Sequence, residues 1–449
     1  MQKTLKKHGT WIGKWTFVLA ATGSAVGLGN IWGFPYKAGT EGGAAFVLIY
    51  LLCIVAIGVP IMISEILIGR RSGNSPINAM KKSAIDSGAS SLWQLVGWTG
   101  IIAGVLILSF YSVIAGICLN YIFIAASPNE LITSSEQFGQ VISSPTNLLI
   151  WHTVFMFLTL LIVSAGVEDG IGRMVKILMP LLGFLLLFMV IYGAINGAFL
   201  EALSFLFAPD FSNVGTDTFL SAMGQAFFSM SLGMGSIMAY GAYMPKEQEI
   251  VSTSFSVGSL DTLVAILAGL AIFPIIFAFN LEPGSGPGLV FVSLLSAFNQ
   301  MEFGQLIGPI FFILLSIAAL SSSISILEPG VAYLAEEGFL TRKQSAIVIS
   351  ILCWVIGIGT ATGFNIFSVV DSSGESINPF LNTMELISVQ ILQPLGGMLI
   401  AIFIGWFMNE SLIKNEIPQI NPFLYSLWRF FIKYVAPLSV AFIFISQII

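Results

Sequence analysis

Three glycines fall within seven residues in the middle of the first long apolar segment, where residues 21–30 read Ala-Thr-Gly-Ser-Ala-Val-Gly-Leu-Gly-Asn. Glycine weakens a helix by roughly 1 kcal/mol relative to alanine. At membrane depth a break also exposes backbone groups that no bulk water can bind, so it persists only where it lines a cavity. Residues 231–236, Ser-Leu-Gly-Met-Gly-Ser, repeat the pattern in a later apolar segment. Two interrupted helices in corresponding positions are typical of the substrate and ion site of a transporter.

Hydrophobic residues make up 56% of the chain and charged residues only 9%, whereas soluble domains carry about 25% charged residues. The composition therefore predicts an all-α integral membrane protein. A spanning helix needs about 20 apolar residues, and we identify eleven such segments: 15–37, 43–69, 92–125, 148–166, 173–196, 218–244, 253–280, 304–335, 343–363, 386–408 and 424–447. Eleven adjacent transmembrane helices form one bundle, so we expect a single transmembrane domain over residues 1–449.

The basic residues indicate the orientation of the bundle, because cytoplasmic loops carry an excess of Lys and Arg. The basic start of the chain resembles a signal peptide, but the apolar run that follows is too long and lacks a cleavage site. With a cytoplasmic N-terminus, only Lys37 lies outside, and the basic residues inside are Lys3, Lys6, Lys7, Lys14, Arg70, Arg71, Lys81, Lys82, Arg173, Lys176, Lys246, Arg342, Lys343, Lys414, Arg429 and Lys433. We expect a multi-pass protein of the cell (inner) membrane with its C-terminus extracellular or periplasmic.

The polar residue pattern argues against an enzyme. The three cysteines all lie in apolar segments without metal-like spacing, as expected for small core residues. His8 and His152 are expected near helix ends as ordinary interfacial residues. No pair of nucleophile and base is visible, and Lys81 and Lys82 are more typical of a helix anchor at the headgroups than of nucleic-acid binding.

The placement of the two breaks suggests an internal repeat. Segments one to five and six to ten each begin with a glycine-interrupted helix, and an odd number of spans in each half inverts the second half. We therefore predict a five-plus-five inverted repeat with broken helices 1 and 6. The first repeat covers 1–197, the second 198–410, and the eleventh helix lies in 411–449.

Several motifs together resemble the neurotransmitter:sodium symporter family. They lie at 23–36 (Gly-Ser-Ala-Val-Gly-Leu-Gly-Asn-Ile-Trp-Gly-Phe-Pro-Tyr), 42–46, Glu65 with 69–71, 111–113, 170–180 and 224–233. The resemblance covers nearly the whole chain, and eleven spans suit a prokaryotic member with the fold of the bacterial leucine transporter.

The resemblance implies two sodium sites at the first break. One sodium ion would be bound by the carbonyl of Ala25 and the side chains of Asn30, Ser229 and Asp261. The second would be bound by the carbonyls of Gly23, Val26 and Ala318 and the hydroxyls of Ser321 and Ser322. Taken alone, the serines at 321–323 would more commonly be interpreted as helix-packing residues.

The resemblance also places the substrate between the two breaks. Its anionic group would meet the amides of Leu28 and Gly29, the Tyr111 hydroxyl and the first sodium ion. Its ammonium would face the carbonyls of Ala25 and Phe228, with Ser229 and Ser231 nearby. The side-chain pocket would be lined by Ile107, Phe228, Met234, Ser322 and Ile326. In isolation, each of these apolar residues is more typical of a core.

Two deep acids need a separate interpretation, since an acid inside a membrane span is functional by default. Chloride-dependent family members have a neutral residue at the position that matches Asp261. A fixed carboxylate there supplies the negative charge, which predicts chloride-independent transport, and it could also bind a proton on the return step. Glu65 is predicted to brace the unwound sixth helix, with a titrating role as the alternative.

The chain departs from the family pattern at both gates. Gly33 stands where the family usually has an arginine that pairs with an outer acid, which aligns with Glu385. Lys37, one turn further out, is a possible substitute for that arginine. At the inner gate, His8 replaces the usual arginine while Trp11 is retained.

The resemblance therefore predicts a sodium-coupled symporter that imports a small zwitterionic solute, with a neutral amino acid as the first choice, by alternating access. A taurine-like zwitterion is the alternative substrate. A membrane solute sensor that binds but does not transport is the alternative function, and a proton-driven transporter is disfavoured by the retained sodium ligands. The expected partners are the substrate, sodium ions and the lipid bilayer, without nucleic acid.

Overall fold

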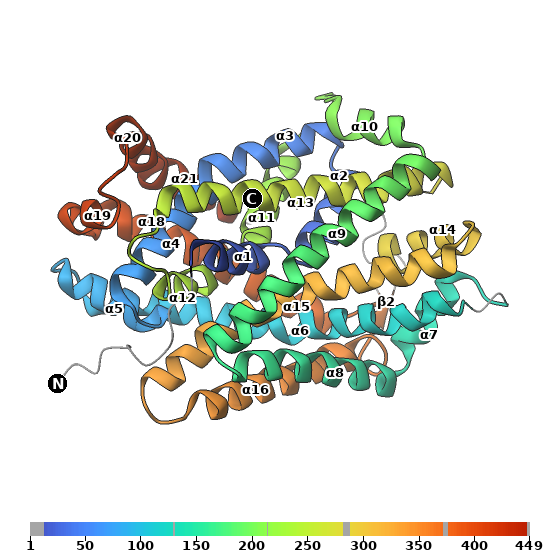
Figure 1. Ribbon diagram of the computed structural model, residues 1–449, viewed down its shortest axis with the longest axis horizontal. Helices are drawn as coiled ribbons and strands as arrows, with labels where there is room; N and C mark the ends of the chain where they lie inside the picture. The colour runs from blue at the N-terminus through green and yellow to red at the C-terminus, as the bar shows by residue number, and fades with distance from the viewer. Residues whose placement is uncertain (1–12, 129–130, 213, 282–287, 371–375, 447–449) are drawn as a thin grey trace.

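The computed structural model describes residues 13–128, 131–212, 214–281, 288–370 and 376–446, which are mostly helical (Figure 1). The strands in these ranges, β1 (Val369–Val370) and β2 (Ser376–Ile377), form an antiparallel hairpin. The α-helices are α1 (Lys14–Ala25), α2 (Phe34–Thr40), α3 (Ala44–Cys53), α4 (Val59–Ser72), α5 (Pro76–Asp86), α6 (Gln94–Ala126), α7 (Ser134–Ser143), α8 (Pro145–Ser164), α9 (Arg173–Asn196), α10 (Phe199–Phe207), α11 (Thr216–Ser229), α12 (Ser236–Ala242), α13 (Ile250–Ala278), α14 (Leu295–Gln300), α15 (Gly304–Glu336), α16 (Arg342–Gly363), α17 (Pro379–Glu385), α18 (Gln393–Ile402), α19 (Glu410–Glu416), α20 (Pro422–Phe430) and α21 (Ala436–Ser446). The π-helical turns are η1 (Gly29–Gly33), η2 (Ile54–Gly58), η4 (Val167–Gly172), η5 (Leu289–Leu294), η6 (Leu386–Leu392), η7 (Phe403–Phe407) and η8 (Phe431–Val435), and η3 (Ser91–Trp93) is a 3-10 turn.

Nine helices in the described ranges are long and apolar enough to cross a membrane. They are Ala44–Ser72, Ser91–Ala126, Pro145–Ser164, Val167–Asn196, Ile250–Ala278, Gly304–Glu336, Arg342–Gly363, Pro379–Phe407 and Pro422–Ile445. A tenth arises when Trp15–Ala25 and Gly29–Thr40, which are bent by 52° at a short break, are counted as one span. The prediction of an all-α membrane protein is therefore confirmed.

The sixth predicted segment, 218–244, contains two shorter helices instead of one. α11 and α12 are separated by residues 230–235, where the second glycine-rich motif lies. The predicted total of eleven spans, which would require α11 and α12 to form a further broken span, stays a prediction. The division into inverted repeats stays a prediction.

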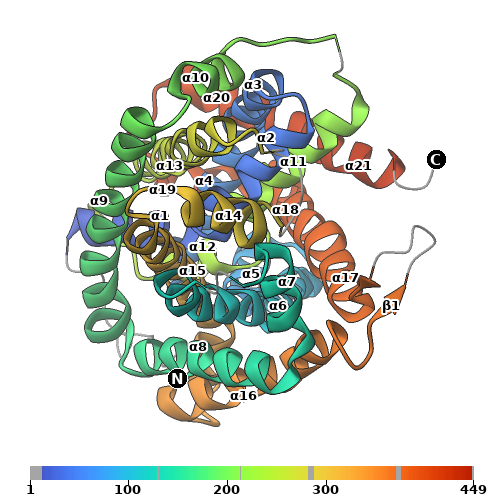
Figure 2. The same cartoon turned by 90° about the vertical axis from the view of Figure 1, so that its right-hand side faces the viewer.

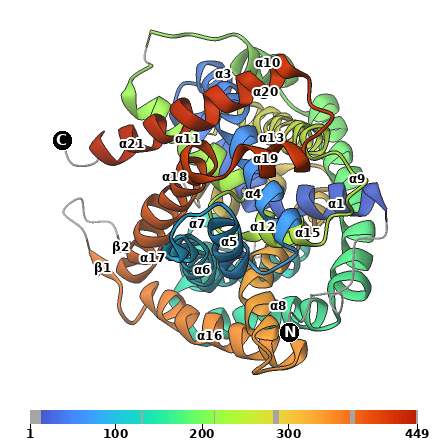
Figure 3. The same ribbon diagram turned by 90° about the vertical axis from the view of Figure 1, so that its left-hand side faces the viewer.

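The broken helices lie inside the bundle, where neighbouring helices can bind the backbone groups that a break releases. α4 and α12 run through the middle of the molecule, with α8, α9 and α16 at its periphery (Figures 2 and 3). Small residues allow this close packing. A Cβ at Gly241 in α12 would lie 2.9 Å from the Cα of Ile66 in α4, and a Cβ at Gly100 in α6 would lie 3.2 Å from the Gly233 carbonyl oxygen.

One histidine prediction is wrong. His152 does not lie at the interface but inside α8, fully buried, with its ring parallel to that of Trp354 in α16. Its Nε2 lies 3.2 Å from the Trp354 carbonyl oxygen. This partner belongs to a neighbouring helix, so it cannot be inferred from the position of His152 within α8. His8 and Trp11 lie outside the described residues. The three cysteines are buried and unpaired, as predicted.

Candidate functional site

The first break separates α1 from η1. α1 ends at Ala25, Val26 is extended (φ −73°, ψ 107°), and helical structure resumes at Gly29. The Gly27 amide donates a hydrogen bond of 3.2 Å to the side-chain oxygen of Asn30 across the break. The glycine motif therefore forms a true interruption, with carbonyl groups around residues 23–26 released from helical hydrogen bonding.

The second break begins after Ser229, where α11 ends. Ser231 adopts φ 53°, an uncommon conformation for a residue with a side chain. Its hydroxyl donates to the Ser24 carbonyl oxygen at 2.8 Å, so the second break satisfies a backbone group beside the first. Gly233 and Gly235 also have positive φ (77° and 78°), which explains why glycine occurs at both positions.

Two polar side chains from other helices stabilise the second break. The Gly233 amide donates to Oε1 of Glu65 in α4 at 2.8 Å, the bracing contact that the sequence predicts for this buried acid. Gln393 at the start of α18 donates to the Phe227 carbonyl oxygen at 3.0 Å. Sequence reasoning missed Gln393, and the only available signal was a polar residue within an apolar segment.

Asn30 and Ser229, from the first predicted sodium site, meet at the carboxylate of Asp261 in α13. Asn30 Nδ2 donates to Asp261 Oδ1 at 2.7 Å, and the Ser229 hydroxyl donates to Oδ2 at 3.2 Å. Tyr50 of α3 also donates to Oδ2, at 3.1 Å, and lies 3.1 Å from the Ser229 hydroxyl. Asp261 is fully buried. Sequence reasoning missed Tyr50, because its aromatic and aliphatic neighbours in the chain give no sign of an acidic partner.

The residues of the second predicted sodium site meet between α1 and α15. The Ser322 hydroxyl lies 3.1 Å from the Val26 carbonyl oxygen and 3.5 Å from that of Gly23. The Ser321 hydroxyl lies 3.4 Å from the Val26 carbonyl oxygen and 3.0 Å from that of Ala318. All of these atoms are oxygens, the donors that hard cations prefer. The donor set therefore fits a dehydrated monovalent cation.

The predicted anion-binding atoms lie beside the first break. The Leu28 amide donates to the Tyr111 hydroxyl of α6 at 3.3 Å. A Cβ at Gly27 would lie 3.0 Å from this hydroxyl and in collision with the Ser322 hydroxyl. A Cβ at Gly29 would lie 2.8 Å from the Phe228 ring. The two glycines therefore allow the first break to pack directly against Tyr111, Ser322 and Phe228.

The remaining predicted pocket residues also lie near the breaks. Met234 and Ile326 flank Gly104 of α6, where a Cβ would lie 3.3 Å from the Ile326 carbonyl oxygen and 4.0 Å from that of Met234. Ile107 lies one turn further along α6 and is fully buried. The structure thus brings backbone from both breaks against the same face of α6.

Gly33, at the end of η1, lies beside Gln225 of α11. A Cβ at Gly33 would lie 3.4 Å from Gln225 Oε1, and Gln225 Nε2 donates to the Gly29 carbonyl oxygen at 2.7 Å. Lys37 donates to the Ser221 carbonyl oxygen at 3.5 Å. Lys37 and Glu385 are charged neighbours, but these two described residues do not form an ion pair within 4 Å.

Beside the end of α12 lies a buried ion pair that sequence reasoning missed. Arg342, the first residue of α16, donates to both oxygens of Glu328 in α15, at 2.9 Å and 2.6 Å. The Tyr243 hydroxyl, just after α12, donates to Glu328 Oε1 at 2.9 Å. Glu328 is fully buried. This cluster joins the end of the second broken helix to α15 and α16.

Removal of one partner of this pair is expected to destabilise the protein, because the remaining charge would be buried alone. Glu328→Gln should lower the free energy of unfolding by about 3–5 kcal/mol. The measurement is chemical denaturation of the purified protein. Glu337→Gln is the control, because Glu337 accepts only an exposed hydrogen bond from Asn78 at 3.0 Å. Equal stability of the two variants would contradict a structural role for the pair.

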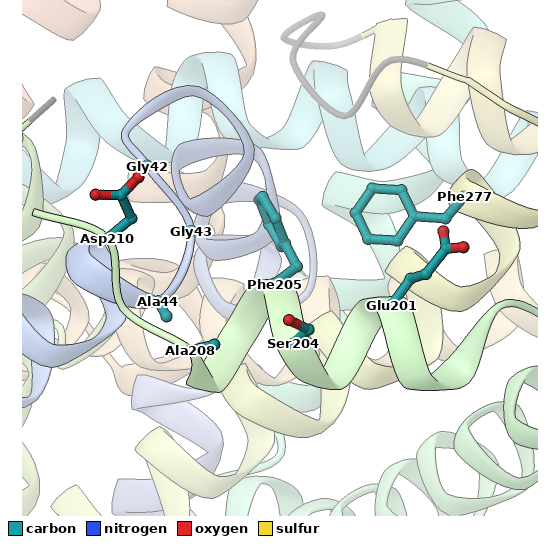
Figure 4. A pocket seen from close by; sticks show the side chains of 9 residues that line it. All are labelled: Gly42, Gly43, Ala44, Glu201, Ser204, Phe205, Ala208, Asp210 and Phe277. Atoms are coloured by element: carbon teal, nitrogen blue, oxygen red, sulfur yellow. The ribbon is translucent and has the colours of Figure 1, made fainter. Parts of the chain in front are cut away.

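A surface pocket of about 480 Å³ lies apart from these clusters, between α3, α10 and α13 (Figure 4). Glu201 and Asp210 are its acidic lining residues, and the others are Gly42, Gly43, Ala44, Ser204, Phe205, Ala208 and Phe277. None of the predicted site residues lines it. The predicted site therefore lies at the helix breaks and not at this pocket.

The chain is similar to known transporters over nearly its whole length. It is 36% identical over 447 residues to the sodium-dependent transporter YhdH of Bacillus subtilis, covering 98% of this chain and 97% of that protein. It is 32% identical over 454 residues to a sodium-dependent transporter of Haemophilus influenzae, covering 99% of both chains. The crystal structure of MhsT in complex with L-phenylalanine matches with a TM-score of 0.89 and 41% identity, covering 98% of this chain and 99% of that chain.

These relatives are transporters and not enzymes, in agreement with the absence of a catalytic signature from the sequence. The profile of the sodium:neurotransmitter symporter family matches residues 8–131 and 129–449. The broken helices, their oxygen-rich contacts and these similarities agree, and the chain belongs to the sodium:neurotransmitter symporter family.

Proposed function

We propose that the protein imports a small zwitterionic solute together with two sodium ions, by alternating access. A neutral amino acid is the first choice of substrate. The observation that carries the proposal is the convergence of two oxygen clusters on one helix break, with the Tyr111 hydroxyl beside them. The related protein MhsT was crystallised with L-phenylalanine, which supports an amino acid as substrate.

Sodium and substrate would be coupled because they share one piece of backbone. Residues 23–30 contribute atoms to both oxygen clusters and to the contact with Tyr111. A ligand that orders this segment lowers the cost of ordering it for the next ligand, which makes binding cooperative. Spans one, two, six and seven would then move as a unit against spans three, four, eight and nine.

The part of the pocket that receives the side chain of the substrate would accept a bulky group. Gly233 and Gly235, on either side of Met234, have positive φ and belong to no helix. A segment without helical hydrogen bonds can adjust its backbone to the substrate at low cost. Aromatic and large aliphatic amino acids are therefore the first candidates.

The proposal is tested by uptake into proteoliposomes with an inward sodium gradient. Radiolabelled neutral amino acids and taurine are each offered to the purified protein. Accumulation of an amino acid above its equilibrium level, lost when potassium replaces sodium, is the expected result. Accumulation of taurine alone would establish the alternative substrate. Sodium-dependent binding without accumulation would instead indicate a solute sensor.

Ser321→Ala is expected to weaken sodium binding about tenfold, because it removes one hydroxyl oxygen from the second cluster while the Ser322 hydroxyl remains. The measurement is the sodium concentration that gives half-maximal uptake. Ser323→Ala is the matched control, because the Ser323 hydroxyl faces Thr159 of α8 at 2.8 Å and not the break. The same sodium dependence in both variants would contradict this assignment.

A further inference from the structure

We propose that Arg429 and Lys433 form a binding site for the headgroup of an anionic phospholipid, between η7 and η8. The inference goes beyond transport, and it uses the proposed orientation only to assign the site to the cytoplasmic leaflet. The proposed site combines two cationic side chains with exposed aromatic rings beside them, and both lie near the end of a membrane span.

The two cations belong to the last predicted span and meet the end of the preceding one. Arg429 donates to the carbonyl oxygens of Ile404 at 2.7 Å and Gly405 at 3.1 Å. A Cβ at Gly405 would lie 3.1 Å from Lys433 Cγ and 3.3 Å from its Cα, so glycine allows the two spans to meet closely. The Lys433 ammonium lies 4.9 Å from the centre of the Trp406 ring. Both positive charges are thus held in place by contacts with η7.

These cations have unused binding capacity. The Arg429 side chain uses two of its five N–H groups on the carbonyls of η7. Among the described residues, Lys433 has no carboxylate within 4 Å, and the nearby acid Glu410 is paired with Lys414 at 2.8 Å. The cluster therefore keeps a positive charge that an anion can neutralise.

The depth of the cluster matches a lipid headgroup. Trp406 lies at the end of the span Pro379–Phe407, and Met408 already has an extended backbone. Trp and Tyr are enriched at this interface of membrane proteins. Trp406, Tyr434 and Phe430 are exposed by 57%, 44% and 53% at the surface of the bundle. A phosphate bound to the cations would leave its acyl chains against these apolar rings.

An anionic lipid can contact both the cations and the apolar rings of this site, whereas a soluble anion can bind only to the cations. Basic pockets between membrane helices are suited to anionic headgroups, and each Lys or Arg near the surface strengthens binding to anionic lipid about fivefold, the equivalent of roughly 1 kcal/mol. Phosphatidylglycerol is therefore the appropriate probe, with phosphatidylcholine as the neutral reference.

The test measures how much phosphatidylglycerol the purified full-length protein retains, by native mass spectrometry, after exchange from mixed phosphatidylglycerol–phosphatidylcholine nanodiscs. Wild type is expected to retain phosphatidylglycerol selectively, and Lys433→Gln is expected to retain about fivefold less. Lys246→Gln, which removes an exposed charge from the turn between α12 and α13, is the matched control and should behave as wild type. Lys433→Arg keeps the charge and should restore retention.

Folding is checked separately by the melting temperature of each variant in phosphatidylcholine alone, which should be unchanged in Lys433→Gln. Inorganic phosphate is added in a further arm and should neither displace the lipid nor stabilise the protein. Equal retention by wild type and Lys433→Gln would overturn the proposal. So would an equal loss in Lys246→Gln, or stabilisation by inorganic phosphate in place of the lipid.

Discussion

Gly27→Ala is expected to lower substrate affinity by at least about a hundredfold while the protein remains folded. The added Cβ would lie 3.0 Å from the Tyr111 hydroxyl and would collide with the Ser322 hydroxyl. Both groups belong to the proposed substrate space. A misplacement of about 1 Å costs an enzyme about a hundredfold in rate, and we expect a loss of similar size in affinity here. The backbone at Gly27 does not need a positive φ, so the loss would come from the occupied space and not from strain.

The measurement for Gly27→Ala is the affinity for the substrate identified by the uptake panel, determined by equilibrium binding in sodium. Gly33→Ala is the matched control from the same broken helix. Its Cβ would lie 3.4 Å from Gln225 Oε1, an ordinary contact. We expect Gly33→Ala to bind as wild type does. Wild-type affinity in Gly27→Ala would show that the substrate does not use this space.

Asp261→Asn is expected to reduce sodium affinity at least about tenfold and to make transport chloride-dependent. In wild type, Asn30, Tyr50 and Ser229 all donate hydrogen bonds to the Asp261 carboxylate, at 2.7 Å, 3.1 Å and 3.2 Å. Hydrogen bonds to a charged group contribute about 1.5–3 kcal/mol each. Asparagine keeps the size of the side chain but removes the charge that would balance sodium, so a mobile anion would have to replace it.

Uptake at increasing sodium concentration, in chloride and in gluconate, measures this effect. Wild type should be indifferent to the anion, whereas Asp261→Asn should recover part of its activity in chloride only. Glu201→Gln provides a control, because it removes an acid that lines the pocket between α3, α10 and α13 and contacts neither oxygen cluster. Chloride-dependent uptake by the wild-type protein would contradict the assigned role of Asp261.

The sequence alone could predict where the chain breaks its helices, because the breaks depend on local glycine content. Both glycine motifs fall between helices in the structure, after Ala25 and after Ser229. The bracing contact of Glu65 joins residues 168 positions apart in the chain, and only the family resemblance predicted it. The breaks, in contrast, follow from a residue and its immediate neighbours in the chain.

Features that depend on packing between distant helices could not be predicted. Tyr50 approaches Asp261 from another helix, more than two hundred positions away in the chain. Glu328 meets Arg342 only because α15 and α16 pack side by side beside Tyr243. His152 was misplaced for the same reason: its environment is set by Trp354, which no pattern around residue 152 indicates.

The central claim is that sodium and substrate bind to one coupled site at the two breaks. The most direct test is thermal stabilisation of the purified protein by a panel of neutral amino acids and taurine, in sodium and in potassium. A ligand that binds the native state raises its melting temperature by mass action. We predict that at least one amino acid stabilises the protein in sodium and has no effect in potassium. Equal stabilisation by that ligand in both salts would contradict the coupled site.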